Sequence, residues 1–214
     1  MNLKKKPIYH ICLLIFSYFL MYFLNNQFQF FPVTVLKPLW LDEKIPFNPY
    51  GVYFYTFAYI FPIVIFIRLY ILEKYHILYF YFTHFFLVSI IANLIFLFFP
   101  THLINNFSQL SYDELSSQSD FLTAFLLKTI YTLDRPYNCS PSLHVASALV
   151  ATFTLFWDKR LYFITSLILT LAICHSTMQV KQHLSFDLYT GILLALVTWL
   201  LLRLLFIKKY PYLK

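Results

Sequence analysis

The sequence predicts an all-α protein, an integral membrane bundle of six transmembrane helices with a short interfacial helix before the fourth span. Hydrophobic residues make up 60% of the 214 residues and charged residues only 12%, whereas about half of an ordinary soluble domain is apolar. The apolar residues gather in runs of roughly 20, the length of helix that crosses the hydrocarbon core of a bilayer. We find no internal repeat and no domain boundary, so residues 1–214 are expected to form a single membrane domain.

Six apolar runs have close to the required length. The first follows Lys4, Lys5 and Lys6 and lacks a small-residue cleavage site, so we expect an uncleaved membrane anchor rather than a signal peptide. The spans are expected at about residues 7–24, 51–72, 76–99, 141–157, 161–180 and 184–207.

The distribution of charge orients the bundle. With the N-terminus in the cytoplasm, most of the 16 Lys and Arg residues fall in inner segments and most of the 9 Asp and Glu residues fall in outer loops. Because cytoplasmic segments retain positive residues, both termini are predicted to be cytoplasmic in a multi-pass protein of the cell (inner) membrane. The net charge of +7 then reflects membrane orientation, and we expect no nucleic-acid partner.

The second long outer loop, residues 100–140, is expected to contain the interfacial helix. Ser119 or Asp120 is a suitable N-cap, and an amphipathic run that begins at Phe121 follows. We expect this helix to lie over the end of the bundle, in the membrane interface. The first long outer loop, residues 25–50, contains prolines but no chemistry that we can assign.

The first of three polar clusters lies at the end of the interfacial helix. Lys128 and Arg135 are two helical turns apart, so both can point to one side before Pro136 ends the helix. Two cations that converge in this way can bind a phosphate, Arg as a planar fork and Lys as a point charge. The alternative is that both side chains reach for the lipid headgroups.

The second cluster begins the fourth span. Ser140 is expected to cap the helix, with Pro141 as its first residue. The amides of Ser142 and Leu143 are then free to bind an anion at the positive end of the helix. The Ser142 hydroxyl adds a donor, and His144 lies in the first turn. The alternative is an ordinary capped helix with an incidental histidine.

The third cluster begins the sixth span. His183, Asp187 and Gly191 recur at four-residue intervals and are expected on one helix face. A carboxylate one turn from an imidazole can fix its tautomer and leave the other ring nitrogen free to attack. Gly191 allows a neighbouring helix to approach closely. The alternative is a polar pair packed between helices.

The predicted topology places all three clusters on the outer side of the membrane, where they resemble the phosphatidic acid phosphatase type 2 superfamily. The pattern of that family is a Lys, six residues and Arg-Pro, then Pro-Ser-Gly-His, then Ser-Arg, five residues, His, three residues and Asp. Lys128–Pro136 matches the first part in full. Pro141–His144 matches the second part except that Leu143 replaces Gly. Ser176–Asp187 matches the third part except that Thr177 replaces Arg.

The resemblance implies a role for each motif residue. His183 would attack phosphorus and form a phosphohistidine, with Asp187 orienting its ring. His144 would protonate the leaving oxygen and then activate water. The residues expected to hold the phosphate oxygens are Lys128, Arg135, Ser142 and Leu143. The resemblance implies no metal and no cofactor.

Two departures from the family pattern leave the final acceptor open. Thr177 removes a basic phosphate ligand. Lys181 could replace that ligand only if the backbone bends, because on a helix it would not share the face of His183. The Ser-Leu-His variant and the missing Arg are similar to the branch that contains the inositol phosphorylceramide synthases. Members of that branch can pass the phosphoryl group, or a phospho-headgroup, to an alcohol.

We therefore expect a membrane lipid-phosphate phosphatase that acts on a phospho- or diphospholipid at the non-cytoplasmic face. Its expected partners are that lipid substrate and the bilayer. Two alternatives stay open. One is a phosphotransferase that uses the same phosphohistidine and an alcohol acceptor, and the other is a non-catalytic membrane protein that retains the fold.

Overall fold

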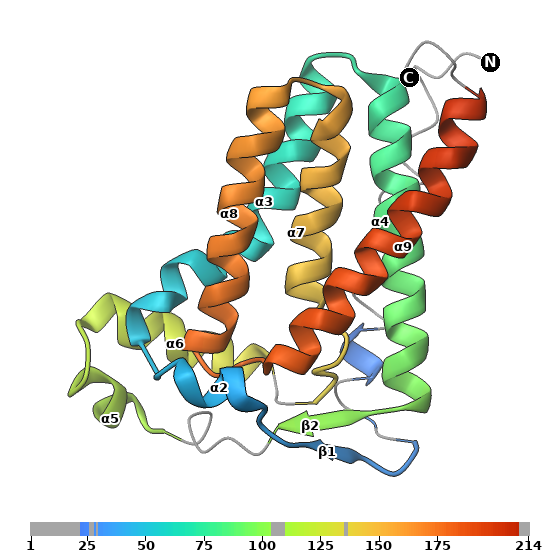
Figure 1. The fold of residues 1–214 in the computed structure, drawn as a ribbon. Coiled ribbons are helices and arrows are strands. Elements are labelled where there is room, and N and C mark those ends of the chain that lie inside the picture. The colour runs from blue at the N-terminus through green and yellow to red at the C-terminus, as the bar shows by residue number, and fades with distance from the viewer. Residues whose placement is uncertain (1–21, 26–27, 29, 104–109, 135–136, 210–214) are drawn as a thin grey trace.

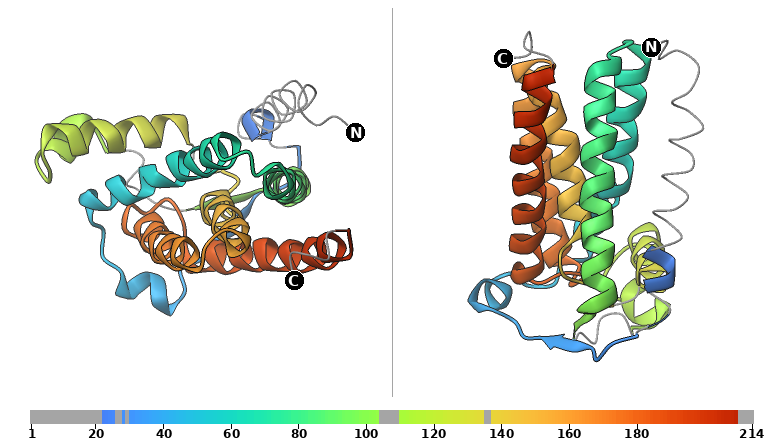
Figure 2. Two further views of the ribbon diagram at one scale, coloured as in Figure 1. Left: turned by 90° about the horizontal axis from the view of Figure 1, so that it is seen from above. Right: turned by 90° about the vertical axis from the view of Figure 1, so that its right-hand side faces the viewer.

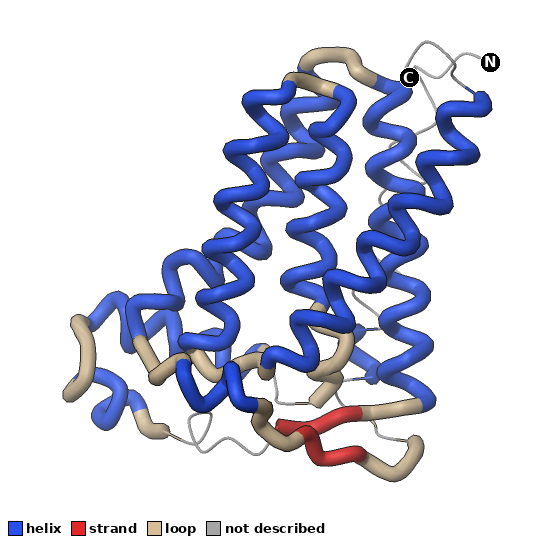
Figure 3. The backbone as a smooth tube through the Cα atoms, in the orientation of Figure 1, coloured by secondary structure: helices blue, strands red, loops and turns tan. Residues whose placement is uncertain are grey.

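The computed structural model of the protein is a helical bundle with a layer of loops and short elements at one end (Figure 1). The structure describes all residues except 1–21, 26–27, 29, 104–109, 135–136 and 210–214. Figure 3 shows that helix dominates the described chain. The bundle consists of α3 (Val52–Ile71), α4 (Tyr75–Phe98), α7 (Leu143–Thr154), α8 (Arg160–Gln179) and α9 (Ser185–Lys209).

Four helices of the described chain are long and apolar enough to cross a membrane by length and composition. They are α3, which the 3-10 turn η1 (Pro49–Gly51) precedes, together with α4, α8 and α9. Their bounds agree closely with four of the predicted spans, which confirms these helices. The chain is therefore a membrane protein of all-α architecture.

The other two predicted spans are not confirmed. At residues 141–157 the structure has a shorter apolar helix, because α7 ends at Thr154 and a 3-10 turn, η3 (Leu155–Trp157), completes it. A rise of 1.5 Å per residue leaves such a helix short of a hydrocarbon core that is roughly 30 Å thick. The span predicted at 7–24 lies almost entirely outside the described residues. At its end, the described residues 22–25 are helical.

Helix α7 occupies the centre of the bundle, and α3, α4, α8 and α9 surround it (Figure 2). Its side chains are small and fully buried at Val145, Ala146, Ala148 and Ala151. Small side chains let neighbouring helices approach closely in an apolar environment. The first turn of α7 is therefore enclosed by other helices rather than exposed to lipid.

The outward faces of the long helices are apolar. Large hydrophobic side chains are exposed along α3, α8 and α9, for example at Ile63, Leu171 and Leu204. A soluble protein rarely exposes contiguous apolar surface of this extent. Lipid tails are the environment that such faces fit.

The two ends of the bundle differ in chemistry. At the end with the α3–α4 and α7–α8 turns, the Asp158 carboxylate binds Arg68 at 2.9 Å and also Lys74. The other end, which we call the loop end, carries short elements that the sequence did not predict. These are the parallel pair β1 (Thr34–Leu36) and β2 (Thr101–Leu103), and the helices α2 (Trp40–Lys44) and α5 (Tyr112–Ser116).

Helix α6 (Phe121–Leu133) lies beside α3 at the loop end (Figure 1). The predicted N-cap is confirmed at Asp120, whose carboxylate accepts from two amides of the first turn. One face, with Leu127, packs against Tyr55 of α3, and Phe121 is exposed at the start of the helix. That α6 lies in the membrane interface stays a prediction.

Two helices approach each other closely where α9 meets the start of α7. A Cβ at Gly191 would stand 2.6 Å from the carbonyl oxygen of Ser142, closer than real Cβ contacts come. The Ser142 amide also donates to the carbonyl oxygen of Asp187 at 3.0 Å. The prediction that Gly191 permits a close helix approach is confirmed.

We expect Gly191→Ala to lower the stability by about 1–3 kcal/mol, because the added methyl group would force α9 away from Ser142. Alanine otherwise favours a helix over glycine by about 1 kcal/mol, so the sign of the change is informative. Thermal unfolding of the detergent-solubilised protein measures it. A raised unfolding temperature would contradict the close packing.

Candidate active site

His183 lies in the turn that joins α8 to α9. Helix α8 ends because Lys181 adopts a left-handed backbone, with φ of 55°, and the amide of His183 donates back to the carbonyl of Thr177 at 3.2 Å. Many helices end with a residue in this conformation. Helix α9 begins at Ser185, so the expectation that His183 itself is helical is wrong, and it precedes the helix by two residues.

His144 lies in the first turn of α7. The expectation that Ser140 caps this helix is wrong, because Ser142 is the N-cap and the helix begins at Leu143. The Ser142 amide is not free, since it donates to the carbonyl of Asp187. Helix geometry instead leaves the amides of Leu143 and His144 without an intrahelical acceptor. The amides available to an anion are thus one residue further along than the sequence predicts.

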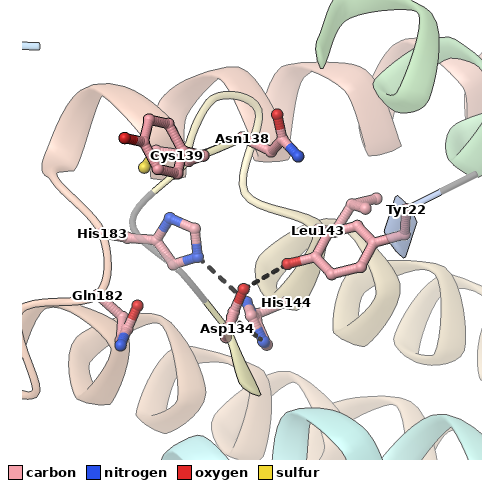
Figure 4. A pocket seen from close by; sticks show the side chains of 9 residues that line it. Tyr22, Asp134, Asn138, Cys139, Leu143, His144, Gln182 and His183 are labelled. Atoms are coloured by element: carbon pink, nitrogen blue, oxygen red, sulfur yellow. Dashed lines mark hydrogen bonds and ion pairs between the residues drawn. The ribbon is translucent and has the colours of Figure 1, made fainter. Parts of the chain in front are cut away.

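The two histidines contact each other in a buried site (Figure 4). His144 Nδ1 and His183 Nε2 are 3.1 Å apart, and both side chains are buried. On the far side of His183, Nδ1 lies 3.4 Å from Asp187 Oδ2. That oxygen also accepts from the amide of Leu184 at 2.9 Å. The structure therefore brings His144, His183 and Asp187 together.

A second carboxylate, Asp134, lies on the far side of His144. Asp134 Oδ2 is 3.5 Å from His144 Nε2 and accepts from the Tyr55 hydroxyl at 3.0 Å, while Tyr22 donates to Oδ1. The Tyr59 hydroxyl is 2.8 Å from His144 Nε2. Asp134 and these tyrosines were not predicted from the sequence. One signal was present, because Tyr55 and Tyr59 are polar-tipped residues one helical turn apart in an apolar span.

The contacts indicate where the ring protons lie. Asp187 favours a proton on His183 Nδ1, which leaves the electron pair of Nε2 directed at His144. His144 Nδ1 then carries the proton of the shared hydrogen bond. A second proton on His144, at Nε2, would face the Asp134 carboxylate. The pair thus combines a nitrogen with a free electron pair and a neighbour that can give and take a proton.

A small pocket opens beside the two histidines. The Asn138 side chain lines it, is 4% exposed, and has no hydrogen-bond partner for Nδ2 or Oδ1. Buried amides are nearly always hydrogen-bonded, so this one is available to a polar ligand. The described residues that line the pocket are Tyr22, Asp134, Tyr137, Asn138, Cys139, Leu143, His144, Gln182 and His183. This described lining contains no Lys or Arg.

The predicted phosphate ligands are placed differently from one another. Leu143 lines the pocket. Lys128 Nζ donates to the carbonyl of Leu110 at 2.9 Å. The Ser142 hydroxyl accepts from the backbone of α7 as its cap. Arg135 lies outside the described residues.

Thr177 stands at the position of the missing family Arg, and Lys181 is its potential replacement. The side chains of both donate hydrogen bonds to backbone carbonyls. Thr177 is fully buried, and its hydroxyl donates to the carbonyl of Cys174 at 2.8 Å. The backbone does bend at Lys181, but Nζ donates to the carbonyls of Asp42 and Ile45. Within the described ranges, no group of three or more His, Cys, Asp or Glu residues is placed to hold a metal ion.

Comparison with known proteins links the chain to one family. A family model described as the PAP2 superfamily matches residues 21–201, which include all three polar clusters. The searches of curated proteins and of solved structures gave no match.

We expect Tyr55→Phe to lower the stability by about 1–3 kcal/mol, because it removes a donor from the buried Asp134 carboxylate. Tyr70→Phe is the matched control, since it removes a hydroxyl from a side chain that lies near the other end of the same helix and is 42% exposed. The control should cost less than about 1 kcal/mol. Thermal unfolding in detergent measures both changes, and equal losses would contradict the buried network.

Proposed function

Since the chain belongs to the PAP2 superfamily, we propose that it is a membrane phosphatase that hydrolyses a phospho- or diphospholipid. The reaction passes through a phosphohistidine at the non-cytoplasmic face. The observation that carries this proposal is the 3.1 Å contact between His183 Nε2 and His144 Nδ1, with a carboxylate beside the far nitrogen of each ring. The apolar outer faces of the bundle support a lipid as the substrate.

In the first step, the electron pair of His183 Nε2 attacks phosphorus. The N–P bond forms as the P–O bond to the leaving group breaks. His144 enters this step protonated on both ring nitrogens, with its Nε2 proton facing Asp134, and gives its Nδ1 proton to the leaving oxygen, which leaves a neutral ring. The leaving group is the lipid alcohol or, from a diphosphate, the lipid monophosphate. Asp187 stabilises the positive charge that develops on the His183 ring. Because the rings are in hydrogen-bond contact, the phosphoryl group enters beside them and separates them.

In the second step, water replaces the departed lipid. It gives a proton to His144 as its oxygen attacks phosphorus, and the N–P bond breaks to return His183 and release phosphate. Asp134, 3.5 Å from His144 Nε2, stabilises the protonated ring and so favours His144 as the proton acceptor.

The phosphate oxygens need donors that strengthen as charge redistributes. The amides of Leu143 and His144 point out from the positive end of α7 and are proposed as two of these donors. Arg135 is proposed as a third, because it directly follows Asp134, which lines the pocket. Two further proposed ligands must first leave their present partners: Lys128 and Ser142.

The charge at the far end of the bundle supports an extracytoplasmic site. Figure 1 shows the α3–α4 and α7–α8 turns at the end of the bundle opposite the starts of α7 and α9. By their places in the chain, Arg68, Lys74 and Lys159 lie at or beside these turns. Since cytoplasmic ends of membrane proteins retain positive residues, we propose that this end faces the cytoplasm in the cell (inner) membrane. The loop end then meets the outer leaflet.

The Asn138 amide supports a second candidate, a phosphotransferase. It is buried in the pocket with both polar atoms unpaired, and it could bind the hydroxyl group of an alcohol acceptor. Leu143 and Thr177 stand where the family pattern has Gly and Arg, as in the branch that contains the inositol phosphorylceramide synthases. In this reaction the alcohol replaces water in the second step, and the product keeps the phosphoryl group or phospho-headgroup.

We expect the purified protein to release phosphate from at least one of phosphatidic acid, phosphatidylglycerophosphate and an isoprenyl diphosphate in excess EDTA. His183→Ala should abolish release, because it removes the nitrogen that bonds to phosphorus. His144→Ala should lower the rate by about 10²–10⁴-fold. The matched control is His175→Ala, which alters an exposed histidine of α8 and should leave the rate unchanged.

The products separate the candidate functions. Phosphate found on an added alcohol, rather than free in solution, would select the phosphotransferase. A third outcome is that no product forms from any of the lipids, with or without an alcohol, and that His183→Ala behaves like the wild-type protein. This outcome would refute both enzymes and favour a non-catalytic membrane protein.

A further inference from the structure

We propose that α2, a short helix of the first outer loop, positions His183 by binding both ends of the turn that carries it. We call this set of contacts the clasp. The turn runs from Lys181 to Ser185, and Asp42 of α2 contacts each of these residues. The inference rests on the proposed function, because it takes His183 as the nucleophile. Asp42 and Lys181 are then positioning residues, which act on the reaction through His183.

Asp42 holds the second end of the turn. Its carboxylate binds both donors of Ser185, with Oδ1 accepting from the amide at 2.6 Å and Oδ2 from the hydroxyl at 2.9 Å. Ser185 is fully buried, and Asp42 is only 8% exposed. The amide of Leu39 also donates to Oδ2 at 2.7 Å, which orients the carboxylate. The start of α9 is therefore bound to α2, and a carboxylate is favourable at this positive helix end.

Lys181 holds the first end of the turn. Its ammonium group donates to the carbonyl of Asp42 at 3.4 Å and to the carbonyl of Ile45. Asp42 belongs to α2 and Ile45 directly follows its last residue, so the ammonium group lies at the C-terminal end of this helix, where a cation is favourable. Burial lowers the pKa of Lys181, and the Asp42 carboxylate offsets part of that shift. The side chain thus points toward α2.

Other hydrogen bonds tie the middle of the turn to the helices on either side. The amide of His183 donates to α8, and the amide of Leu184 donates to Asp187 of α9. These bonds connect the turn to its own neighbours in the chain. The contacts with α2 differ, because they come from a segment more than a hundred residues away and hold the turn from outside.

The clasp matters because His183 Nε2 has to keep its place relative to both His144 and the incoming phosphorus. A displacement of about 1 Å at a reacting atom can lower a rate roughly 100-fold. The clasp also gives Lys181 a function other than the phosphate contact that the missing family Arg would have made. The two functions predict different kinetics, since loss of a ligand weakens phosphate binding and loss of positioning slows the chemical step.

The first test compares Asp42→Ala with Glu43→Ala in the full chain. Glu43 is the matched control, because it has the same charge on the same helix and is exposed. We expect Asp42→Ala to lower kcat by about tenfold or more with little change in KM. Asp42→Asn, which keeps one carbonyl acceptor, should recover part of the loss. An unchanged kcat in Asp42→Ala would overturn the proposal.

The second test asks whether Lys181 positions His183 or binds phosphate. Lys181→Met should lower kcat while the inhibition constant of inorganic phosphate stays the same, and Lys181→Arg should restore kcat. In the double variant that combines Lys181→Met with Asp42→Ala, the fold-decrease in kcat should be smaller than the product of the two separate fold-decreases. Both substitutions release the same turn, so their effects should not be independent. A phosphate inhibition constant raised about tenfold would instead identify Lys181 as a ligand and overturn its part in the clasp.

A third measurement separates failure of the clasp from failure of the proposed function. Amide hydrogen exchange of the 181–186 peptide, measured by mass spectrometry in detergent, does not depend on activity. Asp42→Ala should speed exchange in this peptide and Glu43→Ala should not. If the wild-type protein acts on no lipid but the two variants differ in exchange in this way, the proposed function fails and the clasp stands. Equal exchange in the two variants would overturn the clasp.

Discussion

The contact between the start of α7 and the start of α9 is the constraint on which the site depends. It is close because Gly191 has no Cβ to meet the Ser142 carbonyl, and it is held by the hydrogen bond from the Ser142 amide to the Asp187 carbonyl. His144 follows Ser142 by two residues, and His183 precedes Asp187 by four. This helix contact therefore brings the two histidines within reach of each other.

The site is also a row of polar groups inside an apolar bundle. An unpaired polar group costs several kcal/mol, about 2–7, in such surroundings, and the same low dielectric strengthens each contact that is made. Asp187 is accordingly held by the Leu184 amide, and Asp134 by tyrosine hydroxyls. These contacts hold the carboxylates beside the far nitrogens of His183 and His144. The hydrogen bonds that these buried carboxylates accept therefore also hold them where they prepare the histidines for proton transfer.

Local patterns in the sequence determined much of the fold and part of the site. The four long helices, the cap at Asp120 and the close approach at Gly191 each follow from composition or spacing within a short segment. The proximity of His183 and Asp187 survives although His183 precedes the helix, because four-residue spacing keeps the two side chains within reach. Such features are predictable because few residues, all near one another in the chain, decide them.

Tertiary packing alone decided how these pieces meet. Ser140 and Ser142 are both suitable caps, and the bond from the Ser142 amide to a distant helix accompanies the choice of Ser142. The contact between His144 and His183, the approach of Asp134 and the turn of Lys181 toward α2 join segments that are far apart in the chain. Sequence spacing cannot reveal such contacts, because they depend on how the helices pack and on which buried polar groups must find partners.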